Sequence, residues 1–176
     1  MPRALSLEGE LAADALQVAL QQVIQRHDIL RTRFEEIDGL PMQVLEPQAY
    51  LQLQREDLSA LGTEERDTQL QQRLLAEAAK PFDLSGAPLI RASLIRLAQD
   101  RHVLLLNMHH IVSDAWSNPI LMQDLASAYR SALQGDSQAL PRPAIQYADY
   151  ARWQRQDYPA TPQHAKAARY WRCQRA

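Results

Sequence analysis

Cysteine is nearly absent from the sequence: Cys173 is the single one among 176 residues, which excludes an internal disulfide and a cysteine-rich metal site. Charge of one sign is not in excess, since the sequence has 19 Lys and Arg and 21 Asp and Glu. Nucleic acid and anionic membranes are therefore not expected as partners. No apolar run is long enough to span a bilayer, and the first residues lack the basic-then-apolar order of a signal peptide. These absences predict a cytoplasmic protein.

The sequence does contain an alternation of helical and strand-like apolar spacing, which favours an α/β architecture. We expect Thr63 and Asn118 to be N-caps, Pro81 to end the second helix and Gly135 to close the third. The segments with helical spacing are 11–24, 64–79, 119–133, 147–156 and 163–174.

Strand-like segments alternate with these helices. Residues 31–37 and 42–46 flank Asp38-Gly39 and predict a β-hairpin, because both turn residues tolerate positive φ. Residues 88–97 and 101–110 form two further strand candidates, and the second is apolar on both faces, as a central strand would be. A linker is expected at 136–144.

The second of these strands ends in two adjacent histidines, within the stretch NMHHIVSDAWS at 107–117. Successive strand side chains point to opposite faces, so His109 and His110 cannot both aim at one reacting atom while the strand persists. A histidine at a strand exit before a helix start suits a general base near neutral pH, and the helix N–H groups favour developing negative charge. A purely structural histidine pair is the alternative. A metal site lacks a convincing third ligand.

The histidine stretch does not stand alone. Four stretches, RHDILRTRF, PFDLSGAPLIRASL, MHHIVSDAWS and YADYARWQR, occur in this order, and each resembles a signature of the condensation domains of nonribosomal peptide synthetases. The resemblance implies an α/β two-layer sandwich, with a mixed sheet and packed helices, like one lobe of chloramphenicol acetyltransferase. Residues 1–176 would be the amino-terminal lobe, without the family's first signature helix and second lobe.

The resemblance implies an acyltransferase that forms amide bonds. In the family, the amine of an acceptor aminoacyl thioester attacks a donor acyl or peptidyl thioester. Both substrates are tethered to the phosphopantetheine arms of carrier proteins, and the domain binds no cofactor directly. The implied partners are upstream and downstream carrier domains, an adenylation domain and the second lobe. His110 corresponds to the tunnel histidine, which acts as a base or positions the nucleophile. The 176-residue chain alone is expected not to catalyse condensation at a useful rate.

Supporting roles follow from the same resemblance. Asp114 is expected to pair with Arg31, with Arg26 as the alternative, since a buried carboxylate needs a cationic partner. His109 is expected to support the loop. Trp116 could line the tunnel, although a core position is the ordinary interpretation for such an aromatic residue.

Other residues of these stretches are given ordinary structural roles. His27 is expected to have a capping or surface role, and Tyr147, Tyr150 and Trp153 to pack on a helix face. Ser113 and Ser117 are not expected to be nucleophiles, since no base is assigned to them.

One departure bears directly on the site. Where the family motif ends in glycine, this sequence has Ala115, which adds a methyl group and disfavours positive φ. Activity or substrate choice would change if the backbone needs positive φ there, and a negative φ would make the exchange harmless. The remaining alternatives are an ester-forming or CoA-dependent acyltransferase, an epimerisation domain, and a non-catalytic remnant that docks carriers.

Overall fold

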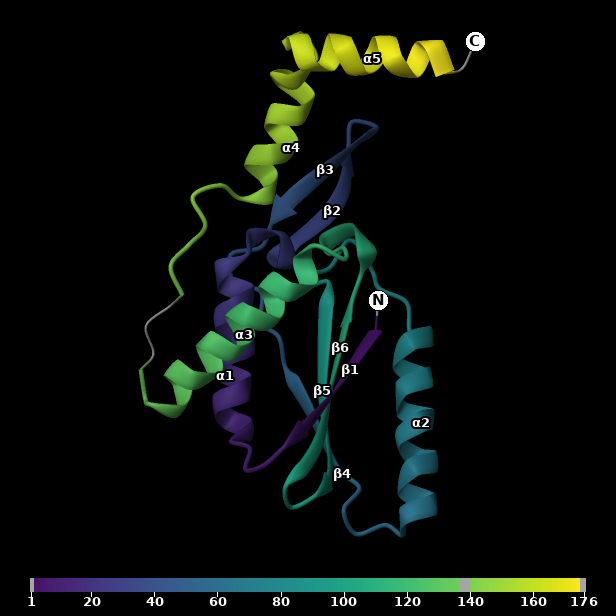
Figure 1. Cartoon of the computed structure of the whole chain (residues 1–176), viewed down its shortest axis with the longest axis vertical. Helices are drawn as coiled ribbons and strands as arrows, with labels where there is room; N and C mark the ends of the chain where they lie inside the picture. Colours follow the sequence, from purple (N-terminus) through teal and green to yellow (C-terminus); the bar gives the residue numbers. More distant parts are fainter. Residues whose placement is uncertain (1, 137–139, 175–176) are drawn as a thin grey trace. The chain divides into compact units, whose positions relative to one another are not determined.

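The computed structural model describes residues 2–136 and 140–174, and they form two compact units, 1–142 and 143–176. The first unit is built on a mixed four-stranded sheet in the order β1-β6-β5-β4 (Figure 1). Its strands are β1 (Pro2–Glu8), β4 (Leu53–Asp57), β5 (Ile90–Ala98) and β6 (Arg101–Met108). The β1-β6 and β5-β6 pairs are antiparallel, and β4 runs parallel to β5.

Two helices cover one face of this sheet and a third lies against the other face (Figure 1). Helices α1 (Ala13–Arg26) and α3 (Ser117–Leu133) pack on each other and on the sheet, where they bury the larger apolar cluster. Helix α2 (Thr63–Ala79) has no fully buried residue and contacts a smaller cluster. The prediction of an α/β fold with a mixed sheet and packed helices is confirmed.

The position of β6 explains why its sequence is apolar on both faces. Seven of its eight residues are buried, because it pairs with β1 on one side and β5 on the other while helices lie on both faces of the sheet. Side chains alternate between faces, so Leu104 and Leu106 pack towards α1 and α3, whereas Val103 packs in the cluster beneath α2. The buried strand β6 is therefore a rigid support for the residues that follow it in the chain, which include the two histidines.

The predicted hairpin is confirmed as β2 (Thr32–Ile37) and β3 (Leu40–Leu45), with Asp38 at φ 52° and Gly39 at φ 75°. Gly135, at φ 71°, ends α3 as predicted: its N–H and that of Asp136 donate to carbonyls of the last helical turn. Two short edge strands, β1 and β4, were missed by the sequence prediction. Their residues are mostly exposed, so their apolar spacing is weak, and pairing with the central strands holds them in the sheet.

Two N-cap predictions were wrong by one or two residues. Helix α2 begins at Thr63, with Gly62 as N-cap, and α3 begins at Ser117, with Trp116 as N-cap. Asn118 lies inside α3, where its buried side chain donates a hydrogen bond to the Asp114 carbonyl at 2.7 Å. The Asp114 carboxylate, which precedes the helix in the chain, accepts a hydrogen bond from the Ser117 N–H and so satisfies the first amide of α3.

The second unit contains α4 (Tyr147–Gln156), the short helix η3 (Tyr158–Ala160) and α5 (Pro162–Gln174), so both helix predictions here are confirmed. The expected packing of aromatic residues takes the form of a ladder: Tyr147, Tyr150, Trp153 and Tyr158 stand in ring contact with centroid separations of 5.1–5.9 Å. Of the predicted linker 136–144, residues 137–139 lie outside the described residues, and the others belong to no helix or strand.

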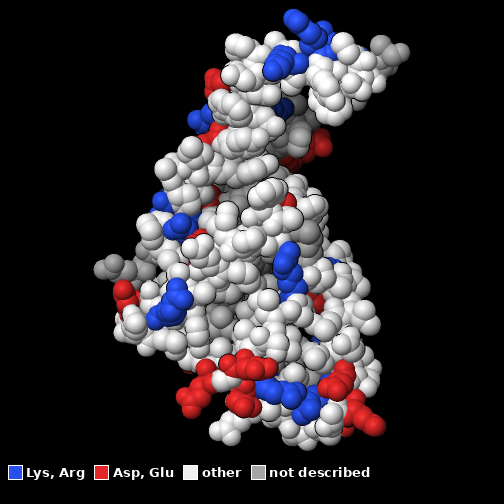
Figure 2. Space-filling model, viewed as in Figure 1, with Lys and Arg blue, Asp and Glu red and all other residues white. Residues whose placement is uncertain are grey.

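Charged side chains of both signs lie side by side on the face shown in Figure 2, most densely at the end of the first unit where β5 turns into β6. The histidine pair follows the opposite end of β6. No extended patch of one sign covers this face, which agrees with the balanced composition. Within residues 2–136 and 140–174, no helix is both long and apolar enough to cross a membrane.

Candidate active site

The candidate site begins where β6 ends, at the turn that carries the two histidines. The His109 N–H still donates to the Leu89 carbonyl at 3.1 Å, and residues His110–Val112 then form a short 3-10 helix, η2. Since the chain leaves extended geometry between the two histidines, their side chains acquire different surroundings. His109 is partly buried and His110 is exposed.

His109 is held on two sides. Its ring meets Phe82 edge-to-face, with the centroids 6.0 Å apart, and its Nδ1 accepts a hydrogen bond from the Ile111 N–H at 3.1 Å. The Arg91 guanidinium covers the same Phe82 ring, 3.7 Å from its centroid. Because Nδ1 accepts this hydrogen bond, it is Nε2 of His109 that can act as a donor. These contacts tie His109 to the loop and to Phe82, and its supporting role at the site stays a prediction.

Among the described residues, one hydrogen bond orients the ring of His110. Its Nδ1 lies 2.7 Å from the carbonyl oxygen of Ser113. A carbonyl can only accept, so Nδ1 carries the proton, and in the neutral ring the lone pair belongs to Nε2. The loop thus presents one histidine whose free nitrogen is a base. This is the tautomer that a general base or a nucleophile-positioning residue needs.

Asp114 is placed differently from the sequence prediction. It is exposed, and its Oδ1 accepts from the Ser117 N–H at 2.8 Å and from the Ser117 hydroxyl at 2.6 Å. Those two hydrogen bonds, mainly the one from the side chain, hold the pKa of Asp114 below its ordinary value, and the nearby His110 lowers it further. The predicted pairing with Arg31 is therefore wrong for this structure, and the alternative, Arg26, pairs with Asp124 at 2.9 Å.

Arg31 is buried, but its partners lie around its own turn. Its Nε and Nη2 donate to the carbonyls of Ile24 and Gln25 at the end of α1, at 3.1 and 3.4 Å. A further bond of 3.2 Å reaches the Pro47 carbonyl, and the ion pair is with Asp28 at 2.6 Å. A guanidinium offers five donors in a fixed fork, so it satisfies the last carbonyls of a helix and a carboxylate together. Arg31 supports α1 and the hairpin entry.

Asp28 is the carboxylate that the sequence prediction overlooked. It lies three residues before Arg31, and it also accepts from Arg142 at 2.6 and 2.8 Å. The i, i+3 spacing of opposite charges within RHDILR was the signal available in the sequence. The contact of Asp124 with His27, at 2.7 Å, had no such signal, because 97 residues separate the two. His27 caps the end of α1, in agreement with its expected capping role.

The backbone at Ala115 answers the question raised by the missing glycine. Asp38 is the one non-glycine residue with positive φ in the described parts of the chain, so the φ of Ala115 is negative. An added methyl group is unstrained there. Trp116, next to it, is 86% exposed, and the expectation that this aromatic residue belongs to the core was wrong. A tunnel-lining role for Trp116 stays a prediction.

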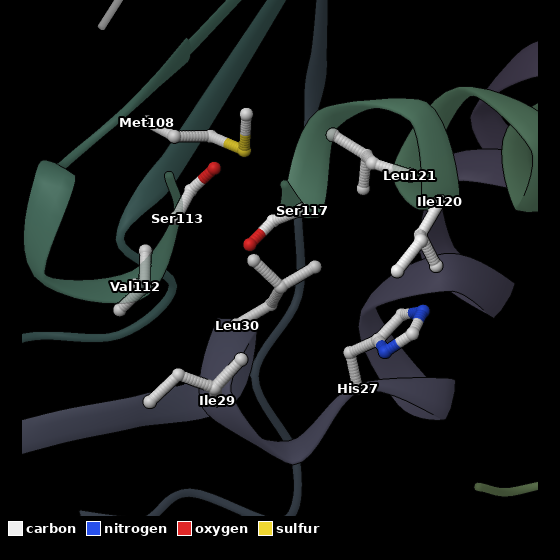
Figure 3. A pocket seen from close by; sticks show the side chains of 9 residues that line it. All are labelled: His27, Ile29, Leu30, Met108, Val112, Ser113, Ser117, Ile120 and Leu121. Carbon is white, nitrogen blue, oxygen red and sulfur yellow. The ribbon is translucent and has the colours of Figure 1, made fainter. Parts of the chain in front are cut away.

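A pocket of about 140 Å³ lies beside the histidine loop, and Figure 3 shows the nine side chains that line it. Six of them are apolar: Ile29, Leu30, Met108, Val112, Ile120 and Leu121. The polar ones are His27, Ser113 and Ser117. Neither serine contacts a histidine base through its hydroxyl group, since Ser117 binds Asp114 and Ser113 Oγ has no hydrogen-bond partner in the described structure. Across residues 2–136 and 140–174, no three His, Cys, Asp or Glu side chains converge as metal ligands.

Comparison with known proteins places this chain in a family. The family model described as Condensation domain matches residues 1–176. A linear gramicidin synthase protein of Brevibacillus parabrevis is 42% identical over 155 residues, which are 88% of this chain and 2% of that protein. Chondramide synthase cmdD of Chondromyces crocatus is 39% identical over 174 residues, 98% of this chain and 4% of that protein.

A solved structure gives the same result at the level of the fold. The SgcC5 protein from Streptomyces globisporus superposes with a TM-score of 0.82 at 30% identity, over 99% of this chain and 39% of that one. The chain therefore belongs to the condensation-domain family and corresponds to the amino-terminal lobe of a condensation domain of nonribosomal peptide synthetases. It spans about 2–4% of the length of these two curated relatives.

Proposed function

We propose that this lobe supplies His110 to amide bond formation between two substrates that are carried as thioesters. One is a donor acyl or peptidyl thioester and the other an acceptor aminoacyl thioester, each on the phosphopantetheine arm of a carrier domain. The observation that carries the proposal is the hydrogen bond between His110 Nδ1 and the Ser113 carbonyl, because it leaves Nε2 as an exposed base at the end of a rigid strand.

The proposed chemistry needs one proton acceptor near the amine. The neutral amine of the acceptor attacks the donor carbonyl carbon, a C–N bond forms, and Nε2 of His110 takes a proton from the nitrogen. The tetrahedral intermediate then collapses, the C–S bond breaks, and the imidazolium returns the proton to the departing thiolate. No atom of the protein enters a covalent bond, which fits the surroundings of Ser113 and Ser117, because in the described residues neither hydroxyl group is hydrogen-bonded to a histidine.

Asp114 has a specific part in this scheme. It occupies the Ser117 N–H and hydroxyl, so this amide at the start of α3 is not free to stabilise an oxyanion. The carboxylate instead ties the loop to the first turn of α3. We propose that Asp114 keeps the Ser113 carbonyl in place for His110, a positioning role that does not require Arg31.

The chemistry is tested in a chimera in which residues 1–176 replace the matching stretch of a condensation domain from chondramide synthase cmdD, with loaded carriers supplied. Formation of the carrier-bound dipeptide is measured. His110→Ala is expected to lower the rate about 10²–10⁴-fold, the usual contribution of a general base. His164→Ala, in the second unit, is the matched control and should leave the rate unchanged. A His110→Ala rate within twofold of the parent chimera contradicts the proposal.

A glutamine at position 110 separates the two roles open to the histidine. The side-chain oxygen of Gln can accept a hydrogen bond from the amine, but it cannot take the proton near neutral pH. Recovery of most of the activity in His110→Gln indicates positioning of the nucleophile, and a rate as low as that of His110→Ala indicates general base catalysis.

A second candidate function, docking of carriers without turnover, is favoured by one observation. Trp116 is 86% exposed and Ile111 40% exposed, and both belong to the histidine loop, residues 109–117. Tryptophan is enriched at protein interfaces, so the exposed Trp116 is a candidate contact for a partner. Binding of carrier protein to the 176-residue chain is measured separately by calorimetry. Binding that is lost in Trp116→Ala, together with a chimera that forms no dipeptide, supports docking alone.

A further inference from the structure

The pocket beside the histidine loop has the size and lining of a site for a small apolar group. Its volume of about 140 Å³ is close to that of an engineered cavity of roughly 150 Å³ that binds benzene. Leu30, Met108 and Leu121 form buried parts of the wall, and Ile120, which is half exposed, lies where the pocket meets the surface. A branched aliphatic side chain or a single six-membered ring fits such a volume.

One buried polar atom faces this pocket without a partner. Ser113 is only 7% exposed, and its Oγ makes no hydrogen bond within the described residues. Figure 3 shows the hydroxyl oxygens of Ser113 and Ser117 turned into the space that the lining side chains enclose. Ser117 already donates to Asp114, so the unused hydrogen-bonding capacity belongs to Ser113. Buried hydroxyl groups are ordinarily paired, so Ser113 Oγ is free to hydrogen-bond to a backbone group of an occupant whose side chain lies against the apolar wall.

The same residue connects the pocket with the candidate catalytic histidine. The carbonyl of Ser113 accepts the hydrogen bond from His110 Nδ1 at 2.7 Å, while the side chain of Ser113 lines the pocket. Val112 and Ser117, on either side, also line it, and Ser117 holds Asp114. Three of the pocket's nine lining residues therefore belong to the loop and helix start that orient His110.

The charge of the lining limits what can enter. His27 is the one lining residue with a titratable side chain, and its Nε2 is engaged with Asp124 at 2.7 Å. A carboxylate or ammonium group entering the pocket would lose its hydration without meeting an opposite charge. The lining thus selects against charged side chains and admits apolar ones.

From these observations we infer that the pocket receives the side chain of a substrate amino acid, of branched aliphatic or small-ring type, while the reacting group lies near His110. Ser113 is the polar contact of this pocket and Ile120 its gate at the surface. The inference rests on the proposed function, because it assumes that aminoacyl or acyl thioesters reach this loop. It adds a substrate class and the residues that select it.

The test uses the 176-residue chain and three soluble probes, the N-acetylcysteamine thioesters of N-acetylleucine, N-acetylglycine and N-acetylglutamate. Binding is measured by calorimetry, and the site by chemical-shift changes of the Met108 and Leu121 methyl groups. The leucine probe is expected to bind about tenfold or more tightly than the glycine probe, as burial of an aliphatic side chain gives, and the glutamate probe no better than glycine.

Two matched variants locate the binding. Ile120→Trp places a large ring where the pocket opens, at a half-exposed position that tolerates the change, and should lower the affinity for leucine to that for glycine. Ile111→Trp adds the same ring on the histidine loop, at a residue that does not line the pocket, and should leave the preference intact. Equal affinities for leucine and glycine probes, or equal effects of the two tryptophans, overturn the inference.

His110→Ala distinguishes failure of the pocket from failure of the proposed chemistry. This variant should keep the leucine preference in binding and lose dipeptide formation in the chimera. If the leucine preference persists and the His110→Ala chimera still forms dipeptide at the full rate, the proposed function is wrong. The pocket then remains a binding site. Dipeptide formation that depends on His110, without any leucine preference, removes the pocket alone.

Discussion

The turn at residues 28–31 buries its charge, whereas the loop at residues 109–117 leaves its charge in solvent. Arg31 donates to three backbone carbonyls and to Asp28, and these contacts join the end of α1 to the residues that follow β3. Asp114 binds only neighbours within the loop and the start of α3. The difference separates the two jobs of the lobe: the turn contributes to stability, and the loop can orient a reacting histidine at little cost to the fold.

The largest expected effect tests the buried side of this comparison. Arg31→Met leaves the carbonyls of Ile24, Gln25 and Pro47 without their donor and removes one of the two arginines at Asp28. Breaking a buried charge pair in this way should lower the free energy of unfolding by about 3–5 kcal/mol. Urea denaturation followed by circular dichroism measures the loss.

Arg142→Met is the control for that variant, since Arg142 binds the same carboxylate from a largely exposed position. Exposed pairs contribute about 0–1 kcal/mol, so the control should remain near the wild-type stability. If Arg31→Met lowers the free energy of unfolding no more than Arg142→Met does, the buried turn does not stabilise the lobe. The proposed difference between the turn and the loop is then wrong.

The next effect separates the two histidines. His109→Ala removes the edge-to-face contact with Phe82 and the acceptor for the Ile111 N–H, which together should cost about 1 kcal/mol. His110→Ala, at an exposed position, should change stability by no more than about 0.5 kcal/mol. Parallel thermal melts compare the two variants. A larger loss for His110→Ala reverses the division between a supporting and a reacting histidine.

A smaller effect concerns the position where the family motif has glycine. Because the φ of Ala115 is negative, Ala115→Gly relieves no strain and only adds freedom to the unfolded chain. The free energy of unfolding should fall by about 0.5 kcal/mol. A clear rise in stability, measured by urea denaturation, would show instead that the loop prefers positive φ and that alanine holds it away from its best geometry.

The smallest effect is a pH dependence of the exposed loop. Hydrogen bonds from Ser117 keep the pKa of Asp114 below its ordinary value of 3.8, so the ionised carboxylate stabilises the folded state above pH 3.8. This stabilisation is lost as the pH falls through the lower, folded-state pKa. The stability difference between wild type and Asp114→Asn should be constant from pH 7 to about 5 and should shrink below about 4. A difference that grows on acidification contradicts the assignment.

Local patterns were enough to predict most of the helices and the hairpin. Apolar spacing marked α1, α2 and α3, and the Asp38-Gly39 pair marked the turn, because these features depend on residues within a few positions of each other. The edge strands β1 and β4 were not predicted, because a mostly exposed strand is defined by the strand it pairs with and not by apolar spacing in its own sequence. The start of α3 was missed for a different reason: the helix begins at Ser117, whose N–H donates to Asp114, and Asn118 lies inside it.

Within the site, the two histidines differ in burial, their separate roles stay a prediction, and the partner that the sequence assigned to Asp114 was wrong. Neighbouring side chains at a strand exit are expected to have different surroundings, and His109 contacts Phe82 and the Ile111 N–H whereas His110 contacts the Ser113 carbonyl. The carboxylate that meets Arg31 depends on how α1 ends and on where η1 (Asp28–Arg31) turns, and Asp28 is simply nearer. Distance along the chain favoured this local partner over the distant Asp114.

By itself the sequence determined the family, the α/β class, the rigid strand that carries the histidines and the chemistry available at its end. The family rests on the resemblance of four ordered stretches to known signatures, and the fold class and the central strand rest on residue types and on spacing within single elements, which local physics is enough to interpret. Tertiary structure alone decided that Arg31 anchors its own turn, that Nδ1 of His110 bears the proton, and that a pocket lies beside Ser113. The first two depend on local turn geometry that brings residues three apart into hydrogen-bonding distance, and the pocket depends on side chains from separate segments meeting; no periodicity along one segment specifies either.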